Sequence, residues 1–282
     1  MSAAGFKQIR RSLFVLGVSS HAAHRRVLIG GKQGTDLQTA HIGFRQVDED
    51  EKDTLVASVF RSVAGQYDLM NDLMSLGGHR LWKDFVISRS SVRSGHKIID
   101  VATGTADHVR RFAERVGPDG QVVGVEINAD MLAIGRSRLV DAGRAQGVEL
   151  LIANAEQLPF IEHRFDCVTI AFGLRNVTHI PIALQAMTRM LRPGGRMLVL
   201  EFSQPRDGPF ARWYDHYSFK LIPPLGRVVA GDEESYRYLV ESIRRHPDQE
   251  TLKDMMLSAG LEDVSYHNLS GGVVALHVGF RY

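Results

Sequence analysis

Apolar runs of strand length alternate with amphipathic stretches through the central part of the chain. Runs without polar alternation are typical of strands that are covered on both faces, and strands separated by helices form parallel sheets. The pattern therefore predicts a doubly wound, Rossmann-like α/β domain. Its expected strands are 97–102, 121–127, 148–153, 165–172 and 196–202, with helices over 105–116, 129–142 and 181–191.

The flanking segments complete this picture. Helical periodicity runs from residue 55 to residue 82, ahead of the first strand. Residues 205–230 contain four prolines and are predicted to be irregular, whereas 233–258 are again helical. Two further strands, 263–269 and 273–282, flank Ser270, Gly271 and Gly272, which is typical of a hairpin. We expect a seven-stranded, mostly parallel sheet that ends in an antiparallel hairpin.

The N-terminal segment differs in charge from the rest of the chain. The first 35 residues carry six Lys or Arg and no acid, and Leu13, Phe14 and Leu16 with Arg10 and Arg11 form a basic amphipathic pattern. This composition is typical of a mitochondrial transit peptide. We predict a transit peptide with its linker over residues 1–45, a catalytic domain over 46–282, and a location in the mitochondrial matrix. A basic tail that carries no address is the alternative.

Charge and cysteine content exclude several classes of function. Beyond the N-terminal segment, 28 basic residues are outnumbered by 32 acidic ones, so a nucleic-acid-binding body is not indicated. The one cysteine, Cys167, lies in an apolar run and is expected to be a buried thiol. No cluster of His, Cys and Asp has metal-ligand spacing, so no metal is predicted.

Small and acidic residues follow the first three expected strands. Asp100 ends the first strand and Gly104 lies in the turn after it, Glu126 ends the second, and Asn154 and Ala155 follow the third. Ligands of open α/β sheets bind beyond these strand ends. Glu126 suits the two ribose hydroxyls of an adenosine and Asn154 the adenine edge. The turn lacks the Gly-x-Gly-x-x-Gly pattern, and Asp100 would repel a pyrophosphate but favour a sulfonium cation. S-adenosylmethionine is the expected cofactor, and a nicotinamide-dependent reductase is the weaker alternative.

Three longer motifs carry a resemblance to a known family. Residues 67–82 (YDLMNDLMSLGGHRLW), 172–177 (FGLRNV) and 189–203 (RMLRPGGRMLVLEFS) resemble the ubiquinone/menaquinone biosynthesis C-methyltransferases. The resemblance extends from about residue 55 to the C-terminus. It implies a class I methyltransferase fold and C-methylation of a polyprenyl-methoxy-benzoquinol ring by S-adenosylmethionine. It carries the cofactor contacts over to Thr105, Glu126, Asn154 and Ala155.

The chain departs from the family pattern at several cofactor positions. The family usually has Gly where Thr103 and Ala106 stand, and often Ser where Ala171 stands. It usually has Asp where Glu126 and Asn154 stand. Glu126 keeps the carboxylate on a longer arm, whereas Asn154 loses a charge. The resemblance therefore leaves cofactor affinity more open than the type of reaction.

Methyl transfer to a ring carbon requires a stabilised phenolate and an acceptor for the ring proton. Arg175 follows the fourth strand and is assigned phenolate stabilisation or orientation of a water, because a guanidinium is a poor base. A salt bridge that closes the sheet end is the alternative for Arg175. His79 is a candidate for proton transfer or for a structural hydrogen bond. Tyr67 and Asn71, four residues apart on one helix face, are candidate substrate contacts. So is Tyr217, which either lines a slot for an isoprenoid tail or packs the loop.

The resemblance also implies partners. It implies other proteins of a multi-subunit ubiquinone-synthesis complex and peripheral contact with the mitochondrial inner membrane. A homodimer is a further expectation. A non-catalytic assembly subunit, in which Thr103 and Ala106 mark a degraded cofactor turn, is a third hypothesis. Methyl incorporation from labelled S-adenosylmethionine discriminates it from the enzyme.

Overall fold

A computed structural model provides the fold of one compact unit, Leu37–Tyr282. No described helix is long and apolar enough to cross a bilayer. The described residues are 39–48, 51–52, 54–56, 58–59, 71–72, 75, 77–205, 208, 214 and 216–282.

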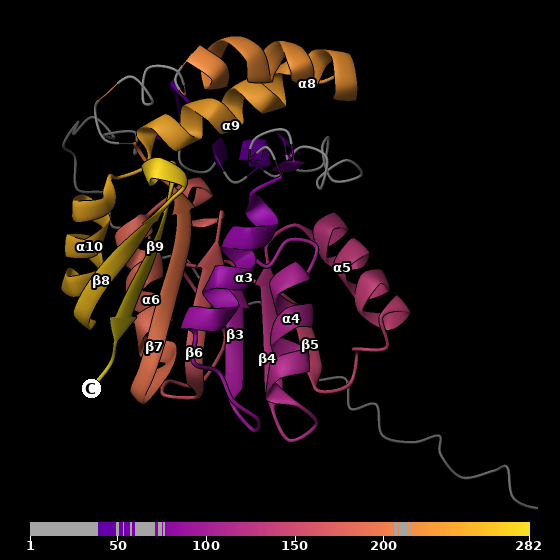
Figure 1. The fold of residues 1–282 in the computed structure, drawn as a ribbon, viewed down its shortest axis with the longest axis vertical. Coiled ribbons are helices and arrows are strands. Elements are labelled where there is room, and N and C mark those ends of the chain that lie inside the picture. Colours follow the sequence, from indigo (N-terminus) through magenta and orange to yellow (C-terminus); the bar gives the residue numbers. More distant parts are fainter. Residues whose placement is uncertain are drawn as a thin grey trace, which may run out of the picture. The chain divides into compact units, whose positions relative to one another are not determined.

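The described part of this unit is organised around a seven-stranded sheet with the order β5-β4-β3-β6-β7-β9-β8 (Figure 1). The first five strands in this order pair in parallel, and β9 pairs antiparallel with both β7 and β8. The predicted sheet and its closing hairpin are therefore confirmed. The strands are β3 (Lys97–Val101), β4 (Gln121–Glu126), β5 (Val148–Ile152), β6 (Phe165–Ala171), β7 (Leu191–Phe202), β8 (Glu262–Leu269) and β9 (Val274–Phe280).

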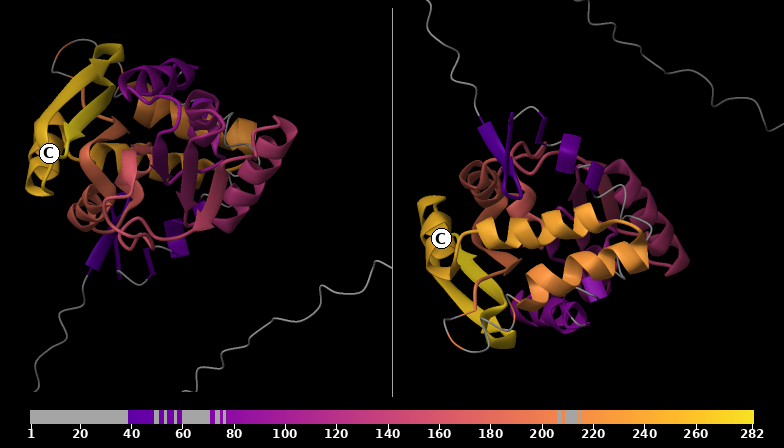
Figure 2. Two further views of the ribbon diagram at one scale, coloured as in Figure 1. Left: turned by 90° about the horizontal axis from the view of Figure 1, so that it is seen from below. Right: turned by 90° about the horizontal axis from the view of Figure 1, so that it is seen from above.

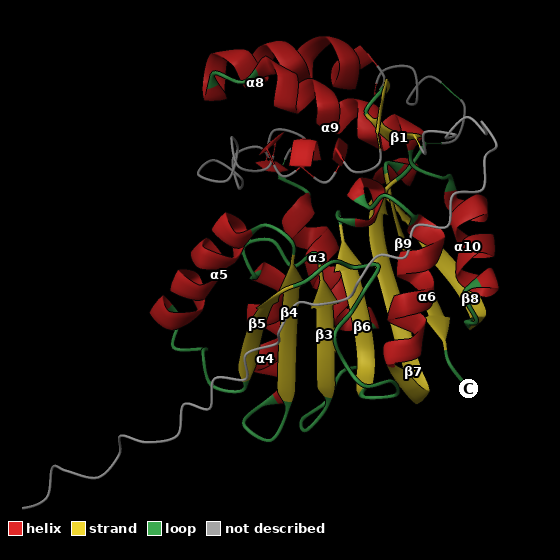
Figure 3. Cartoon of the chain, turned by 180° about the vertical axis from the view of Figure 1, so that it is seen from behind, coloured by secondary structure: helices red, strands yellow, loops and turns green. Residues whose placement is uncertain are grey.

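Helices cover both faces of the sheet. On one face lie α3 (His79–Arg89) and α4 (Asp107–Val116), and on the other α6 (Ile180–Met190) and α10 (Gln249–Ser258) (Figures 1 and 3). Side chains of β3 alternate between the two layers, since Ile98 packs in the core with Phe112 whereas Ile99 packs with Met187. Burial on both faces explains why the central strands are continuously apolar. α5 (Ala129–Asp141) lies beside the β4–β5 end of the sheet.

The C-terminal helices differ from the prediction in two places. The expected helix over 233–258 is two helices, α9 (Glu233–Arg245) and α10, because Pro247 forces His246 into an extended conformation (ψ 141°). The 205–230 segment, predicted to be irregular, contains a π-helical turn over Tyr217–Leu221 and the helix α8 (Ile222–Ala230). Its prolines 223 and 224 fall in the first turn of α8, directly after the π-helical turn. α8 and α9 run side by side across the carboxyl ends of the strands (Figure 2).

A small hairpin precedes the sheet domain. β1 (Thr39–Ile42) pairs antiparallel with β2 (Arg45–Asp48), and alternation along β1 buries Ala40 and Ile42. This hairpin lies partly within the range predicted as leader and linker, so the compact unit begins earlier than residue 46. Residues 1–38, the rest of the range predicted as transit peptide and linker, lie outside the described residues.

Candidate active site

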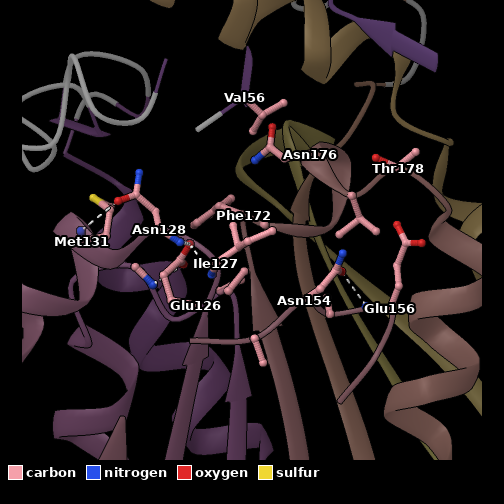
Figure 4. A pocket seen from close by; sticks show the side chains of 17 residues that line it. Val56, Glu126, Ile127, Asn128, Met131, Asn154, Glu156, Phe172, Asn176 and Thr178 are labelled. Carbon is pink, nitrogen blue, oxygen red and sulfur yellow. Dashed lines mark hydrogen bonds between the residues drawn. The ribbon is translucent and has the colours of Figure 1, made fainter. Parts of the chain in front are cut away.

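A cleft opens where the order of the strands reverses. The chain passes from β3 outward through β4 to β5 and then returns to place β6 on the other side of β3, so the loops after β3 and β6 diverge. The cleft measures about 810 Å³ with its open mouth included, within the range of about 300–1,000 Å³ typical of small-molecule and cofactor sites. Residues after all four strands line it, and Val56 faces it from the segment before α3 (Figure 4).

The turn after β3 forms the floor of the cleft. Ala102, Gly104 and Ala106 all have positive φ (51°, 57° and 63°), a conformation that is costly for alanine. The turn is held from below, because the Asp100 carboxylate accepts hydrogen bonds from the hydroxyls of Thr103 (2.7 Å) and Thr169 (2.5 Å). Asp100 is 2% exposed and is not among the described residues that line the cleft. Asp100 thus supports the turn, and its direct contact with the cofactor stays a prediction.

Glu126 lies at the end of β4 with its carboxylate fixed by backbone groups. Oε2 accepts from the Gly104 N–H (2.9 Å), and Oε1 accepts from the N–H groups of Ile127 and Asn128 (both 3.0 Å). Burial raises the pKa of this carboxyl, whereas the three N–H donors oppose the rise. A carboxylate offers about four acceptor sites over its two oxygens. Oε1 already has two donors and Oε2 has one, so Oε2 can still accept from a ligand hydroxyl. The longer arm of Glu126 thus ends in a pre-oriented acceptor.

The segment after β5 supplies the wall next to Glu126. The Oδ1 atom of Asn154 accepts from the Glu156 N–H (2.9 Å), which directs the amide nitrogen of Asn154 toward the cleft (Figure 4). Ala153 and Ala155 present only methyl groups beside it. Glu156 also lines the cleft, and its carboxylate holds the backbone N–H and ring Nδ1 of His179 (both 2.9 Å). An amide above small side chains suits a flat ring with a polar edge.

The charge of the cleft identifies the kind of ligand it favours. Its described lining contains two carboxylates, Glu126 and Glu156, and no Lys or Arg. A pyrophosphate-bearing dinucleotide would face uncompensated negative charge there, whereas a sulfonium cation gains from it. The arrangement of acid, amide and open glycine turn fits S-adenosylmethionine and disfavours the nicotinamide alternative.

Two expected features of the cofactor turn lie elsewhere. Thr105 is 3% exposed, is outside the described cleft lining, and accepts a hydrogen bond from Arg138 (3.0 Å). Its hydroxyl therefore joins the turn to α5, and the cofactor contact expected of Thr105 stays a prediction. Ala106 packs on the same helix, since a Cβ at Gly135 would lie 2.9 Å from the Ala106 Cβ. Gly135 therefore gives the space that Ala106 takes up.

Arg175 is committed to a buried ion pair. Its guanidinium lies 3.0 Å from the Glu201 carboxylate, and the two side chains are 4% and 2% exposed. The same Nη1 donates to the Phe172 carbonyl at 2.5 Å, and the backbone N–H of Arg175 donates to Glu201 (3.2 Å). Arg175 is not among the described cleft-lining residues. The ion pair supports the alternative, a salt bridge at the sheet end, and the contact with a phenolate stays a prediction.

The candidates before the sheet are divided by the structure. His79 is 5% exposed and outside the described cleft lining, and its Nε2 lies 2.9 Å from Asp72 Oδ1. Burial lowers the pKa of this imidazole despite that carboxylate. The bond to Asp72 fits the structural reading of His79, and the proton-transfer reading stays a prediction. Asn71 is half-buried and is not among the described residues that line the cleft. Its backbone carbonyl accepts a hydrogen bond from Ser75 Oγ (2.6 Å). Tyr67 lies outside the described residues.

The structure places Tyr217 outside the described cleft lining and brings in residues that the sequence did not single out. Tyr217 packs against the core rather than in the described lining of the cleft, which favours the packing interpretation. Asn176 instead faces the cleft and accepts a hydrogen bond from the Tyr238 hydroxyl (2.8 Å). Its place directly after Arg175 in a family motif was the available signal. Asn128, Met131 and Phe172 complete the lining beside β4 and β6.

Two solved structures share this fold. A SAM-dependent methyltransferase from Thermotoga maritima aligns with a TM-score of 0.55 at 18% identity, over 80% of this chain and 99% of that one. A phosphoethanolamine N-methyltransferase from Haemonchus contortus, solved with S-adenosyl-L-methionine, aligns at 0.53 and 14% identity, over 71% and 52%. Together with the acidic cleft, the fold is that of a SAM-dependent methyltransferase.

Sequence comparison narrows the class to one family. A model of the ubiE/COQ5 methyltransferase family matches residues 46–281, and the chain belongs to that family. It is 56% identical to the ubiquinone/menaquinone biosynthesis C-methyltransferases UbiE of Pseudomonas paraeruginosa and Pseudomonas savastanoi, over 89% of this chain and 98% of each relative. These relatives are bacterial, so the predicted mitochondrial matrix location is not supported and is withdrawn.

Proposed function

We propose that the chain methylates a ring carbon of a polyprenyl-methoxy-benzoquinol, a step of ubiquinone synthesis. The observation that carries the proposal is the acidic cleft at the switch point, in a chain that is 56% identical to proteins named as quinone C-methyltransferases. S-adenosylmethionine, when bound, supplies the electrophilic methyl group. An electron-rich quinol carbon is the matching nucleophile.

The residues at the strand ends divide the work of holding the cofactor. The Glu126 carboxylate accepts the ribose hydroxyls, and Asn154 meets the adenine edge between Ala153 and Ala155. Gly104 permits close approach of the backbone because it has no Cβ in a left-handed turn. Because methyl transfer depends mainly on positioning, fixed acceptors of this kind contribute by aligning the donor.

The quinol ring is proposed to lie at the mouth of the cleft, on the side of Asn176. The ion pair of Arg175 and Glu201 fixes the short 3₁₀ turn Leu174–Asn176, and the Tyr238 hydroxyl fixes the Asn176 amide. Arg175 is thus a positioning residue, and Asn176 is the group that meets substrate. The helices α8 and α9 lie above the carboxyl ends of the strands (Figure 1), and the apolar tail is proposed to lie beneath them.

The finer features of the partners stand as proposals that rest on the resemblance. A quinol with an isoprenoid tail resides in a membrane, so peripheral membrane contact follows from the proposed substrate. Association with other quinone-synthesis enzymes and a homodimer are proposed on the same ground. Sedimentation of the purified chain, alone and with vesicles, tests the homodimer and the membrane contact directly, and pull-down from a cell extract tests the association.

The proposal is tested by methyl incorporation. Purified chain is incubated with methyl-labelled S-adenosylmethionine and either a demethylated benzoquinol with a short isoprenoid tail or the corresponding naphthoquinol. Label in the ring of the benzoquinol is expected. Glu126→Gln should lower incorporation, whereas Glu162→Gln, an exposed acid outside the described cleft lining, should leave it unchanged. If neither acceptor is labelled although the chain is folded and binds the cofactor, the proposed function is refuted and a non-catalytic subunit is favoured.

A further inference from the structure

Two loops with a strained first residue meet at the cleft. Ala102 follows β3 and Phe172 follows β6, which are neighbouring parallel strands, and both residues line the cleft. Both have positive φ (51° and 57°), a conformation that is costly for any residue with a Cβ. Strain of this kind persists only where the surrounding packing holds it, and it gathers at functional sites. The packing between these two loops is therefore the feature to explain.

Gly173 is the residue at which the two loops touch. A Cβ at Gly173 would overlap the Ala102 Cβ, far inside the roughly 3.5–4.0 Å at which carbon atoms pack. The Ile170 side chain, by contrast, would lie at an ordinary 3.5 Å from it. The φ of Gly173 is −112°, which alanine adopts without strain. Gly173 is therefore required for the close approach of Ala102 and not for its own backbone conformation.

Ala102 belongs to the turn on the cofactor side of the cleft. The N–H of the next residue, Thr103, donates to the Val125 carbonyl (3.0 Å), and the Gly104 N–H donates to the Glu126 carboxylate (2.9 Å). These bonds hold the turn from the side of β4. A push on Ala102 from the side of β6 would therefore displace the turn toward Glu126, the group proposed to hold the ribose.

Gly173 belongs to the segment on the acceptor side of the cleft. Its carbonyl accepts a hydrogen bond from the Asn176 N–H (3.1 Å), and this bond closes the 3₁₀ turn Leu174–Asn176. Gly173 and Asn176 both line the cleft. Gly173 thus contacts the cofactor turn on one side and is bonded on the other to the residue proposed to meet the quinol.

We propose that the contact between Ala102 and Gly173 sets the separation of the methyl donor from the quinol carbon, so that Gly173 is a positioning residue of the transfer. The inference rests on the proposed function and deepens it. Methyl transfer requires the reacting atoms to lie about 3–3.5 Å apart and in line. A methyl group added at Gly173 would force the two loops apart by about 1 Å, and a misplacement of this size costs a rate factor of about 100.

The test measures kcat for methyl transfer to the short-tailed benzoquinol, and S-adenosylmethionine affinity by calorimetry, in the full chain. Gly173→Ala should lower kcat about 100-fold at saturating substrates. Cofactor affinity should fall by a smaller factor, because the side chains of Glu126 and Asn154 remain. The double variant Ala102→Gly/Gly173→Ala removes the methyl group that the new Cβ meets. Its kcat should therefore exceed that of Gly173→Ala about tenfold or more.

Gly195→Ala is the matched control for a crowded glycine that has no part in positioning. Gly195 lies beside the start of β6, at the opposite end of the sheet, and a Cβ there would be 2.8 Å from the Arg192 carbonyl oxygen. This variant should lose stability in urea unfolding and keep the kcat of its folded fraction.

The outcomes separate this inference from the proposed function. If Gly173→Ala keeps the wild-type kcat, or if the double variant is no faster than Gly173→Ala, the inference is overturned and the proposed function stands. If the wild-type chain binds S-adenosylmethionine but labels neither the benzoquinol nor the naphthoquinol, the proposed function fails and the inference falls with it.

Discussion

Replacing Arg175 by alanine separates a structural role for this residue from a role in contact with substrate. The Glu201 side chain is 2% exposed and receives three hydrogen bonds, from Arg175 Nη1 (3.0 Å) and from the backbone N–H groups of Arg175 (3.2 Å) and Phe202 (3.1 Å). Arg175→Ala removes the only charged partner of the three. The carboxylate then stays buried with two backbone donors and no counter-charge.

The expected loss follows from breaking one side of a buried pair. Such substitutions typically lower the free energy of unfolding by about 3–5 kcal/mol. The two remaining backbone donors place Arg175→Ala near the lower end, at about 3 kcal/mol. Replacing both Arg175 and Glu201 by leucine leaves no unpaired buried charge. The free energy of unfolding of this double variant should therefore be higher than that of Arg175→Ala.

The assay combines urea unfolding with calorimetric titration of S-adenosylmethionine. We expect Arg175→Ala to lower the unfolding midpoint strongly and the double leucine variant to recover much of it. Because neither side chain lines the described cleft, cofactor affinity should be retained in the folded fraction of both. A change below about 1 kcal/mol in Arg175→Ala, with turnover abolished, would refute the structural assignment and restore the phenolate role.

Three further predictions concern the cleft and the core. Glu126→Ala should weaken S-adenosylmethionine binding roughly tenfold or more, because it removes a pre-oriented charged acceptor; equal affinity in calorimetry would exclude the ribose role. Ala106→Gly should raise the free energy of unfolding by up to about 1 kcal/mol by relieving a left-handed alanine (φ 63°); a lower melting temperature would contradict this. Burial lowers the pKa of His277 to about 4, below its unfolded value near 6.5. The folded state binds fewer protons than the unfolded chain, so the free energy of unfolding is highest above pH 6.5 and falls by about 2 kcal/mol by pH 5. If a His277→Asn variant shows the same loss of stability with falling pH, His277 does not cause it.

The fold could be predicted from the pattern of apolar runs because the central strands are buried on both faces. Ile98 and Ile99 face opposite helix layers, so both must be apolar, and a continuous run results that pattern reading detects easily. The helix α8 was not predicted because Pro223 and Pro224 indicate a helix end unless their position in a first turn is known. The break at His246 was visible in the following proline, yet the helical periodicity on both sides concealed it.

The sequence predicts those site residues whose positions follow from the course of the main chain. It does not predict the pairing of side chains that are distant in the sequence. Glu126 and Asn154 follow strand ends that topology alone brings together. Arg175 also follows a strand end, but its partner Glu201 lies 26 residues further along and within another strand. Asp100 and Thr105 were expected in the cleft, and their bonds to Thr169 and Arg138 depend on contacts that no local pattern contains.

The central claim is that the cleft beyond β3, β4 and β5 holds a cationic methyl donor. Calorimetric titration of the purified chain with S-adenosylmethionine and, separately, with NADH tests it most directly. The acidic, cation-free described lining predicts saturable binding of S-adenosylmethionine at one site per chain and no binding of NADH. Binding of NADH without S-adenosylmethionine would contradict the claim and return the chain to the nicotinamide-dependent alternative.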